Sequence, residues 1–272
     1  MGKIVSLVNQ KGGVGKTTTS INLSSSLGYF DKKVLLIDLD PQSNTTIGLG
    51  VDPSKVKKSI YNVMMGECDV TEAIIKTPFK NLSVIPALID LAGADIELIQ
   101  ISVQDKDFII TEQLKKQLVK IKDRYDYILI DCPPNLGVLT TNALAASDSV
   151  LIPIQCEYYS LEAVKQLLST IRKIQQRINS NLSIEGVLLT MLDGRTLIGL
   201  DVVEEVRKFF NEIVFSTIIP RLVKLVEAPS HGKPIIEYDP KSKGALAYLN
   251  LAKEVIERNE KNGRRDESGD RK

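Results

Sequence analysis

Tryptophan is absent from this 272-residue chain, histidine occurs once, and cysteine occurs only three times. The cysteines are Cys68, Cys132 and Cys156, and they form no C-x-x-C pair. Zinc and iron–sulfur centres need clustered thiolates, so the spacing argues against such a site within one chain. So few cysteines, in odd number, are also typical of a protein from a reducing compartment.

Long apolar runs are missing as well. No run approaches the roughly 18 residues that identify a membrane-spanning helix. The first residues, "MGKIVSLVNQKGG", pass directly into a predicted strand and loop, and their apolar part is too short for a signal peptide. The formal net charge is only +1, so nucleic-acid binding would need a local basic patch. We therefore expect a cytoplasmic protein with no membrane-embedded segment.

Short segments rich in valine, isoleucine and leucine alternate with segments of helical length. The predicted strands are 3–9, 33–40, 82–87, 125–133, 149–155, 184–192 and 214–220, and the predicted helices include 16–30, 107–122 and 158–178. Several strands are almost continuously apolar, as is typical of parallel strands covered on both faces. The alternation predicts an α/β fold: a single domain with a doubly wound, mostly parallel sheet and helices on both faces.

No linker or internal repeat interrupts this alternation, so we expect one domain over residues 1–258. The remaining segment, "NEKNGRRDESGDRK" (259–272), contains no large apolar residue. Such a segment cannot bury enough apolar surface to offset the entropy of ordering it. We expect residues 259–272 to form a disordered, charged tail.

The segment "NQKGGVGKTT" (9–18) lies between a predicted strand and a predicted helix, where phosphate-binding loops occur. The standard loop pattern is G-x-x-x-x-G-K-[ST]. Here Gln10 stands where the pattern has its first glycine, and Lys11 adds a second lysine to the loop. The segment therefore predicts a P-loop that departs from the standard pattern.

The remaining loop residues fit the binding of ATP with Mg²⁺. Glycines allow backbone N–H groups to turn inward around an anion, and the helix N-terminus adds partial positive charge. Lys16 would reach the β- and γ-phosphates, and Thr17 would ligate Mg²⁺. The other residues expected to contact the nucleotide here are Gly12, Gly13, Val14, Gly15 and Thr18.

Carboxylates follow two of the predicted strands. Asp131 ends "YILID", where we expect it to organise Mg²⁺ through water at the carboxyl edge of the sheet. Asp38 and Asp40 are two residues apart, so we expect them to share one face of a strand. Asp40 precedes Pro41 and is the better candidate to orient a water molecule at the γ-phosphate, and we expect it, like Asp131, to contact Mg²⁺ through water. Cys132 stands where many ATPases have a catalytic glutamate, so a base must come from elsewhere.

Five segments together resemble the ParA family of DNA-partitioning ATPases, in particular its chromosomal, Soj-type members. They are "KGGVGKTT", "LLIDLDPQ", "YILIDCPP", "PIQCEYYSLE" and "EAPSHGKPI", and the resemblance covers residues 1 to about 258. The first segment alone indicates only a deviant Walker A ATPase, a group that includes MinD and the nitrogenase iron protein. The resemblance implies that Lys11 crosses a dimer interface to the partner's nucleotide and that two loops approach closely at Gly12. It also implies an ATP-dependent homodimer with weak intrinsic ATPase activity.

The resemblance implies three further contacts. Pro220 and Leu222 would line the adenine pocket, although close relatives often have asparagine where this chain has Leu222. Nonspecific double-stranded DNA of the nucleoid would contact Arg195, Arg221, Lys224, Lys241 and Lys243. Relatives often have arginine where this chain has Lys224. A ParB-type centromere-binding protein would stimulate ATP hydrolysis and so drive chromosome or plasmid segregation.

Other functions remain open at this point. A MinD-like ATPase that positions cell division at the membrane would need an amphipathic C-terminal helix. A reductase like the nitrogenase iron protein would need cysteines shared between two chains. A nucleotide-binding scaffold would show no phosphate release. We assign no chemistry to His231, nor to Glu157 and Tyr158, which we expect near the dimer face.

Overall fold

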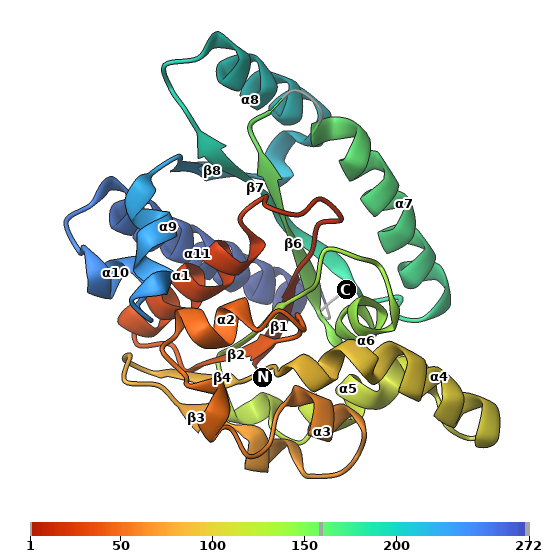
Figure 1. Cartoon of the computed structure of the whole chain (residues 1–272). Coiled ribbons are helices and arrows are strands. Elements are labelled where there is room, and N and C mark those ends of the chain that lie inside the picture. The colour runs from red at the N-terminus through yellow and green to blue at the C-terminus, as the bar shows by residue number, and fades with distance from the viewer. Residues whose placement is uncertain (1, 158–159, 270–272) are drawn as a thin grey trace.

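The computed structural model describes residues 2–157 and 160–269, and its centre is one eight-stranded sheet with the order β3-β4-β2-β5-β1-β6-β7-β8 (Figure 1). The strands are β1 (Lys3–Leu7), β2 (Val34–Asp38), β3 (Ile75–Lys76), β4 (Leu82–Ile85), β5 (Tyr127–Asp131), β6 (Ser149–Gln155), β7 (Ser183–Leu192) and β8 (Val214–Pro220). All neighbours pair in parallel except β3, which runs antiparallel to β4. The predicted mostly parallel sheet is confirmed.

All seven predicted strands are present, and β3 is an addition of two residues at one edge. Every residue of β2, β5 and β6 is buried, which explains why these segments are almost continuously apolar. A two-residue strand is too short to show any alternation of apolar and polar residues. The sequence therefore carries no signal from which β3 could be predicted.

Helices cover both faces of the sheet, as predicted (Figure 1). One face packs against α1 (Lys16–Tyr29), α9 (Val223–Ser230), α10 (Ile235–Tyr238) and α11 (Lys243–Gly269). The other packs against α3 (Ile60–Met64), α4 (Ala94–Gln104), α5 (Gln113–Leu118), α6 (Val138–Ala146), α7 (Ser160–Arg177) and α8 (Leu197–Phe210). The short α2 (Asn44–Gly48) contacts α1, and 3₁₀ turns lie at 53–55, 70–73, 89–93, 110–112, 122–124 and 211–213.

The helix predicted for residues 107–122 is much shorter than expected. A 3₁₀ turn at 110–112 leads into α5, which ends at Leu118, and a second 3₁₀ turn follows at 122–124. Leu114, Leu118 and Ile121 are nevertheless fully buried, as the apolar spacing predicts. Residues three apart also lie on one side of a 3₁₀ turn, so the spacing identifies the buried side chains without defining the length of the helix.

The disordered tail expected from residue 259 is not what the structure shows. Helix α11 continues without interruption to Gly269. Glutamate, lysine and arginine, which are common in this segment, favour helix without needing a core to pack against. Low apolar content predicted the absence of core contacts, and the error was to infer disorder from it. Residues 270–272 lie outside the described residues.

The register of the central strands brings three loops together. Leu7 of β1 and Asp38 of β2 both lie opposite Asp131 of β5, so these three strands end at the same level. The loops that follow them therefore meet at one edge of the sheet, where open α/β sheets bind their ligands. Helix α1 begins at this edge and runs back across the sheet.

Candidate nucleotide-binding site

The loop between β1 and α1 has the backbone geometry of a phosphate-binding loop. Gly13 and Gly15 have φ angles of 73° and 87°, a conformation that side chains other than glycine rarely adopt. The Val14 side chain is buried beneath the loop, and the Thr190 hydroxyl donates a 2.8 Å hydrogen bond to the Val14 carbonyl oxygen. This hydrogen bond fixes the loop to β7. The backbone N–H groups of the loop lie directly before the N-terminus of α1.

Lys16 is the first residue of α1 and is only 7% exposed. Its ammonium group donates to the carbonyl oxygen of Asn9 at 3.1 Å, across the base of the loop. Burial lowers the pKa of Lys16, and the nearby carboxylate of Asp131 opposes that shift. A buried, positively charged group inside a glycine-rich loop is suited to hold a phosphate.

Asn9 was not singled out from the sequence, although it supports this arrangement. Its side-chain amide donates to the Pro153 carbonyl oxygen at 2.7 Å and accepts from the Lys11 N–H at 3.0 Å. Asn9 therefore joins the start of the loop to β6. Its position at the end of a predicted apolar strand was the only available signal.

Asp131 ends β5 and is completely buried. Three hydroxyl groups donate to its carboxylate: Thr17 at 2.8 Å, Ser20 at 3.0 Å and Thr45 at 2.7 Å. Burial raises the pKa of Asp131, and these three hydrogen bonds oppose the shift. The expected position of Asp131 at the carboxyl edge is correct, and the pairing with Thr17 is direct.

The Thr17 hydroxyl and the Asp131 carboxylate both offer hard oxygen ligands for a metal ion. They are hydrogen-bonded to each other, and Thr17 directly follows Lys16. Mg²⁺ prefers oxygen ligands and usually keeps several waters, so one hydroxyl and one neighbouring carboxylate are sufficient protein contacts. These residues therefore fit a magnesium ion bound together with a nucleotide. Among the described residues, no group of three or more His, Cys, Asp or Glu side chains forms a metal cage of its own.

Asp38 and Asp40 do not share a strand face, contrary to our expectation. Strand β2 ends at Asp38, and the Asp40 N–H turns back to the Asp38 carboxylate at 3.2 Å. Asp38 is fully buried and also accepts from the N–H and hydroxyl of Thr46, at 2.8 and 2.6 Å. Burial and the neighbouring Asp131 raise the pKa of Asp38 to about 7. Asp38 therefore shapes the turn that presents Asp40.

Asp40 is half-buried at this turn and accepts a 3.0 Å hydrogen bond from the Gln42 N–H. The preceding residue, Leu39, donates its N–H to the Asp131 carbonyl oxygen at 3.0 Å, which keeps Asp40 near the phosphate loop. The charge of Asp40 raises the pKa of both Lys16 and Cys132. Cys132 is 1% exposed, and burial strongly raises the pKa of its thiol. The thiol stays protonated, so Asp40 is the better candidate of the two to accept a proton or orient water.

Lys11 and Gly12 lie on the outer side of the loop. The Lys11 ammonium is 3.4 Å from the Glu157 carboxylate of the same chain, and the two side chains are 36% and 49% exposed. A Cβ atom added to Gly12 would meet nothing within 4 Å in the described part of the chain. Both residues therefore face solvent in a single copy. Tyr158, expected nearby, lies outside the described residues.

A pocket of about 260 Å³ opens directly beside Gly15 and Thr18. Pro220 and Leu222 both line it, as expected for residues of an adenine pocket, and the other lining residues are Thr190, Met191, Ile219, Arg221, Leu225, Val226 and Tyr248. Mostly apolar walls beside a phosphate loop suit a purine base. The backbone of Met191 is left-handed, with φ of 56°, which is an uncommon and strained conformation for this residue type. Its side chain lines the pocket beside Gly15, a role that the sequence did not suggest.

Comparison with known proteins agrees with this geometry. A family model described as an AAA domain matches residues 2–184. The chain is 56% identical over 255 residues to the sporulation initiation inhibitor protein Soj of Bacillus subtilis, covering 94% of this chain and 98% of that protein. It is 48% identical over 258 residues to the chromosome-partitioning ATPase Soj of Treponema pallidum, covering 95% and 98%. The chain belongs to the ParA family.

A solved structure supports the same fold. The cobyrinic acid a,c-diamide synthase of Mycobacterium smegmatis, with bound ATP analogue and magnesium, is 36% identical and matches with a TM-score of 0.82 over 93% of each chain. The resemblance of this chain to ParA proteins, inferred from five short segments, is therefore confirmed. No helix in the described part of this ParA-family chain is long and apolar enough to cross a membrane.

The five basic residues expected to contact DNA lie around the end of β8 and the elements next to it. Arg195 follows β7, and its guanidinium forms two hydrogen bonds with Asp193, at 2.9 and 2.7 Å. Arg195 holds the pKa of Asp193 well below its usual range, and Arg221 contributes to the same shift. The two arginines are therefore neighbours, although Arg195 has a carboxylate partner in its own chain.

The three lysines lie on the other side of β8. Lys224, in the first turn of α9, forms an ion pair with Asp239. Lys241 and Lys243 are exposed close to that aspartate, and Lys243 lines a surface hollow together with Pro220. The structure thus gathers the five candidates at one end of this ParA-family domain and shows that two of them have acidic partners.

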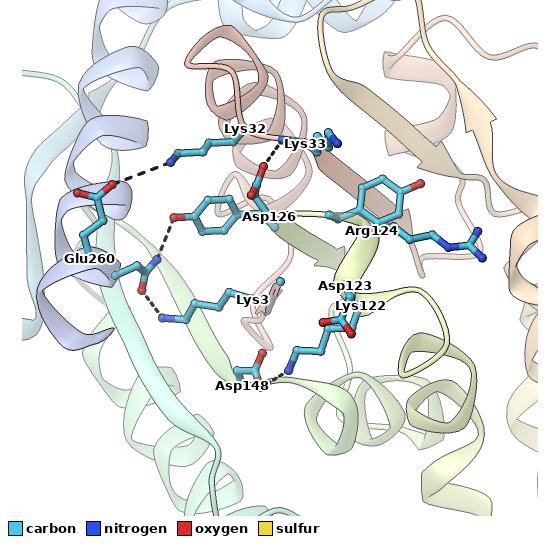
Figure 2. Close-up of a pocket in the computed structure, with 13 residues that line it drawn as sticks. Lys3, Lys32, Lys33, Lys122, Asp123, Arg124, Asp126, Asp148 and Glu260 are labelled. Atoms are coloured by element: carbon cyan, nitrogen blue, oxygen red, sulfur yellow. Dashed lines mark hydrogen bonds and ion pairs between the residues drawn. The ribbon is translucent and has the colours of Figure 1, made fainter. Parts of the chain in front are cut away.

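A larger hollow of about 730 Å³ lies at the opposite edge of the sheet, where the strands begin (Figure 2). Lys3, Lys32, Lys33, Lys122 and Arg124 line it together with four acidic residues. Many of these charges are paired: Lys122 contacts Asp148, and Lys32 contacts Glu260 (Figure 2). Parallel sheets bind ligands at the carboxyl ends of their strands, so we assign the nucleotide to the loop of Lys16 and not to this hollow.

Replacing Lys16 with alanine tests the phosphate loop. Loss of a buried, charge-assisted phosphate contact should weaken Mg-ADP binding at least about a hundredfold, or about 2.7 kcal/mol. Isothermal titration with Mg-ADP measures the effect on a single chain. Lys11→Ala serves as the matched control and should bind Mg-ADP nearly as well as the original chain, because Lys11 points outward. Equal ADP affinity for Lys16→Ala would contradict the assignment of the loop.

Proposed function

We propose that this chain is an ATP-driven switch for DNA partition. It binds Mg-ATP, forms a homodimer with two nucleotides between the chains, and then binds nucleoid DNA without sequence preference. A ParB-type partner stimulates hydrolysis, which returns the chain to a monomer and releases the DNA. Repeated cycles would segregate a chromosome or a plasmid in the cytoplasm.

The observation that carries the proposal is the outward position of Lys11 and Gly12 beside a complete phosphate loop. The Lys11–Glu157 pair is exposed, and pairs of that kind contribute only about 0–1 kcal/mol. So weak a contact leaves Lys11 available to exchange Glu157 for a triphosphate on a second chain. A positive charge supplied in this way stabilises the phosphates only when two chains face each other.

The basic residues around β8 supply the second half of the switch. Exposed ion pairs such as Arg195–Asp193 are weak, and a guanidinium has five donors, so part of Arg195 can still contact phosphate. One chain offers only a few such contacts. A dimer doubles them, and each neutralised phosphate adds about 0.9 to the salt dependence of binding.

Attachment to a membrane, as in a MinD-like protein, is the alternative. That function needs apolar side chains on the end of an amphipathic helix. The basic residues near β8 offer positive charges for the phosphates of DNA, so we favour DNA over lipid as the surface that this switch binds.

Dimer formation can be tested at Gly12. Gly12→Val should fold and bind Mg-ADP normally, because its own chain leaves room for the side chain, yet remain a monomer with ATP. Gly12→Ala should weaken the dimer less, and Lys11→Ala should weaken it about tenfold or more through loss of the charge. Sedimentation with a nonhydrolysable ATP analogue measures all three. A Gly12→Val dimer as stable as the original would refute close approach at this residue.

Hydrolysis can be tested at Asp40. Asp40→Ala should still form ATP-dependent dimers but release phosphate about 10²- to 10⁴-fold more slowly, because water loses its orienting carboxylate. Asp40→Asn is the matched variant, since its side-chain oxygen can still accept from the Gln42 N–H. If Asn restores turnover, Asp40 acts only by shaping the turn. Slow turnover in both variants assigns the effect to the charge.

The decisive experiment for the whole proposal is a salt titration of duplex binding with ATP, with ADP and without nucleotide. Binding should require ATP, be equal on unrelated sequences and weaken steeply with salt. Arg195→Ala and Arg221→Ala should lower affinity on every duplex and reduce the salt slope by about 0.9 per lost phosphate contact. Arg124→Ala, at the opposite edge of the sheet (Figure 2), is the control. Equal binding with ADP would refute an ATP-gated DNA surface.

A further inference from the structure

Helix α4 exposes an apolar stripe that no other described element covers. Ile96, Ile99 and Val103 are 63%, 48% and 77% exposed, whereas Ala94 and Leu98 on the inner side of the same helix are fully buried. At 100° per residue the three exposed side chains fall within about 60° of one another, directly opposite the buried side. The stripe is therefore a second apolar face of α4, separate from the buried face formed by Ala94 and Leu98.

The spacing of the stripe is that of a helix-pairing surface. Ile89, in the 3₁₀ turn before α4, is 74% exposed and precedes Ile96 by seven residues. With Ala92 between them, the exposed positions 89, 92, 96, 99 and 103 repeat at alternating intervals of three and four residues. This is the interval at which one helix presents side chains to another along a shared seam.

Acidic side chains flank the stripe near its N-terminal end. Glu67 accepts a 2.7 Å hydrogen bond from the Asn62 side-chain amide of α3. Burial raises the pKa of Asp90, and the carboxylates of Glu67 and Glu97 add to the shift. Glu97 accepts a hydrogen bond from the Tyr61 hydroxyl at 2.5 Å. Within residues 2–157 and 160–269, no lysine or arginine forms an ion pair with these three carboxylates.

This charge distribution identifies the kind of partner. A second copy aligned in parallel would bring the same carboxylates together. An antiparallel copy would place them against "QDKD" (104–107), which is also net acidic. Like charges at a helix seam oppose pairing, whereas lysine or arginine beside the seam favours it. A basic amphipathic helix complements both the apolar stripe and its acidic flank.

We propose that the stripe formed by Ile89, Ile96, Ile99 and Val103 is a docking surface for a basic amphipathic helix of a partner protein. Helix α4 is linked to the nucleotide site through α6, because Asp95 of α4 accepts a 3.1 Å hydrogen bond from the Leu139 N–H at the start of α6. Helix α6 begins directly after the loop that follows Asp131. A helix bound to α4 would thus contact an element joined to that loop. Docking itself does not depend on the partition function proposed above.

The test uses the full chain and two synthetic peptides of about 20 residues, long enough to cover the stripe at about 1.5 Å per residue. One peptide carries leucine at alternating intervals of three and four with lysine on the flanks, and the other carries glutamate in place of lysine. Fluorescence anisotropy should show binding at least about tenfold tighter for the lysine peptide. Ile96→Ser/Ile99→Ser should lose at least about tenfold of that affinity.

The matched control is Ile198→Ser in α8, which is 61% exposed and lies far from α4 (Figure 1). It should bind the lysine peptide like the original chain. Glu67→Gln/Asp90→Asn should weaken binding and flatten its salt dependence. Because all these residues are exposed, the variants should keep the original melting temperature.

Two results would overturn the proposal. The first is equal affinity of the original chain and Ile96→Ser/Ile99→Ser for the lysine peptide. The second is loss of the ATP-dependent dimer in that double variant, since this would assign the stripe to the interface between two copies. Failure of DNA binding in the salt titration would refute the partition function and leave the peptide result unaffected.

Discussion

The buried carboxylate of Asp131 is the contact on which the nucleotide site depends. Three hydroxyl donors, from Thr17, Ser20 and Thr45, hold it at the end of the central strand β5. A carboxylate removed from water without such partners would cost several kcal/mol. The carboxylate therefore ties α1 and α2 to β5, and in doing so fixes the phosphate loop and the Asp40 turn relative to each other.

The same arrangement separates a rigid interior from exchangeable contacts at the rim. Lys16 and Asp131 are buried and bonded to backbone or hydroxyl groups. Lys11, Arg195 and Lys224 are exposed, and each pairs with one carboxylate of its own chain. Exposed pairs are weak, so these three cations can change partners without disturbing the fold. A nucleotide-dependent switch of ParA type needs this combination of a fixed site and replaceable surface contacts.

The sequence predicted some elements of the structure correctly and others only in part. The apolar runs predicted seven strands, because a strand covered on both faces must be apolar along its length. The glycines and Lys16 before a helix predicted a phosphate loop. Gln10 in place of the first glycine and the additional Lys11 predicted that the loop is of the deviant type. The helix predicted at 107–122 was wrong in extent, and α11 continues to Gly269 where the sequence predicted a disordered tail. Spacing and composition reveal burial, and neither one shows where a helix ends.

The sequence by itself determined the fold class, the phosphate loop and the identity of its lysine, because these depend on residue type at fixed spacing. Only the tertiary structure decided that Asp38 supports Asp40 instead of sharing its face, that Met191 lines the pocket beside Gly15, and that Lys11 pairs with Glu157. It alone decided that Ile96, Ile99 and Val103 face solvent. Each of these depends on which segments distant in sequence become neighbours, and that is fixed by strand order and packing and not by local spacing.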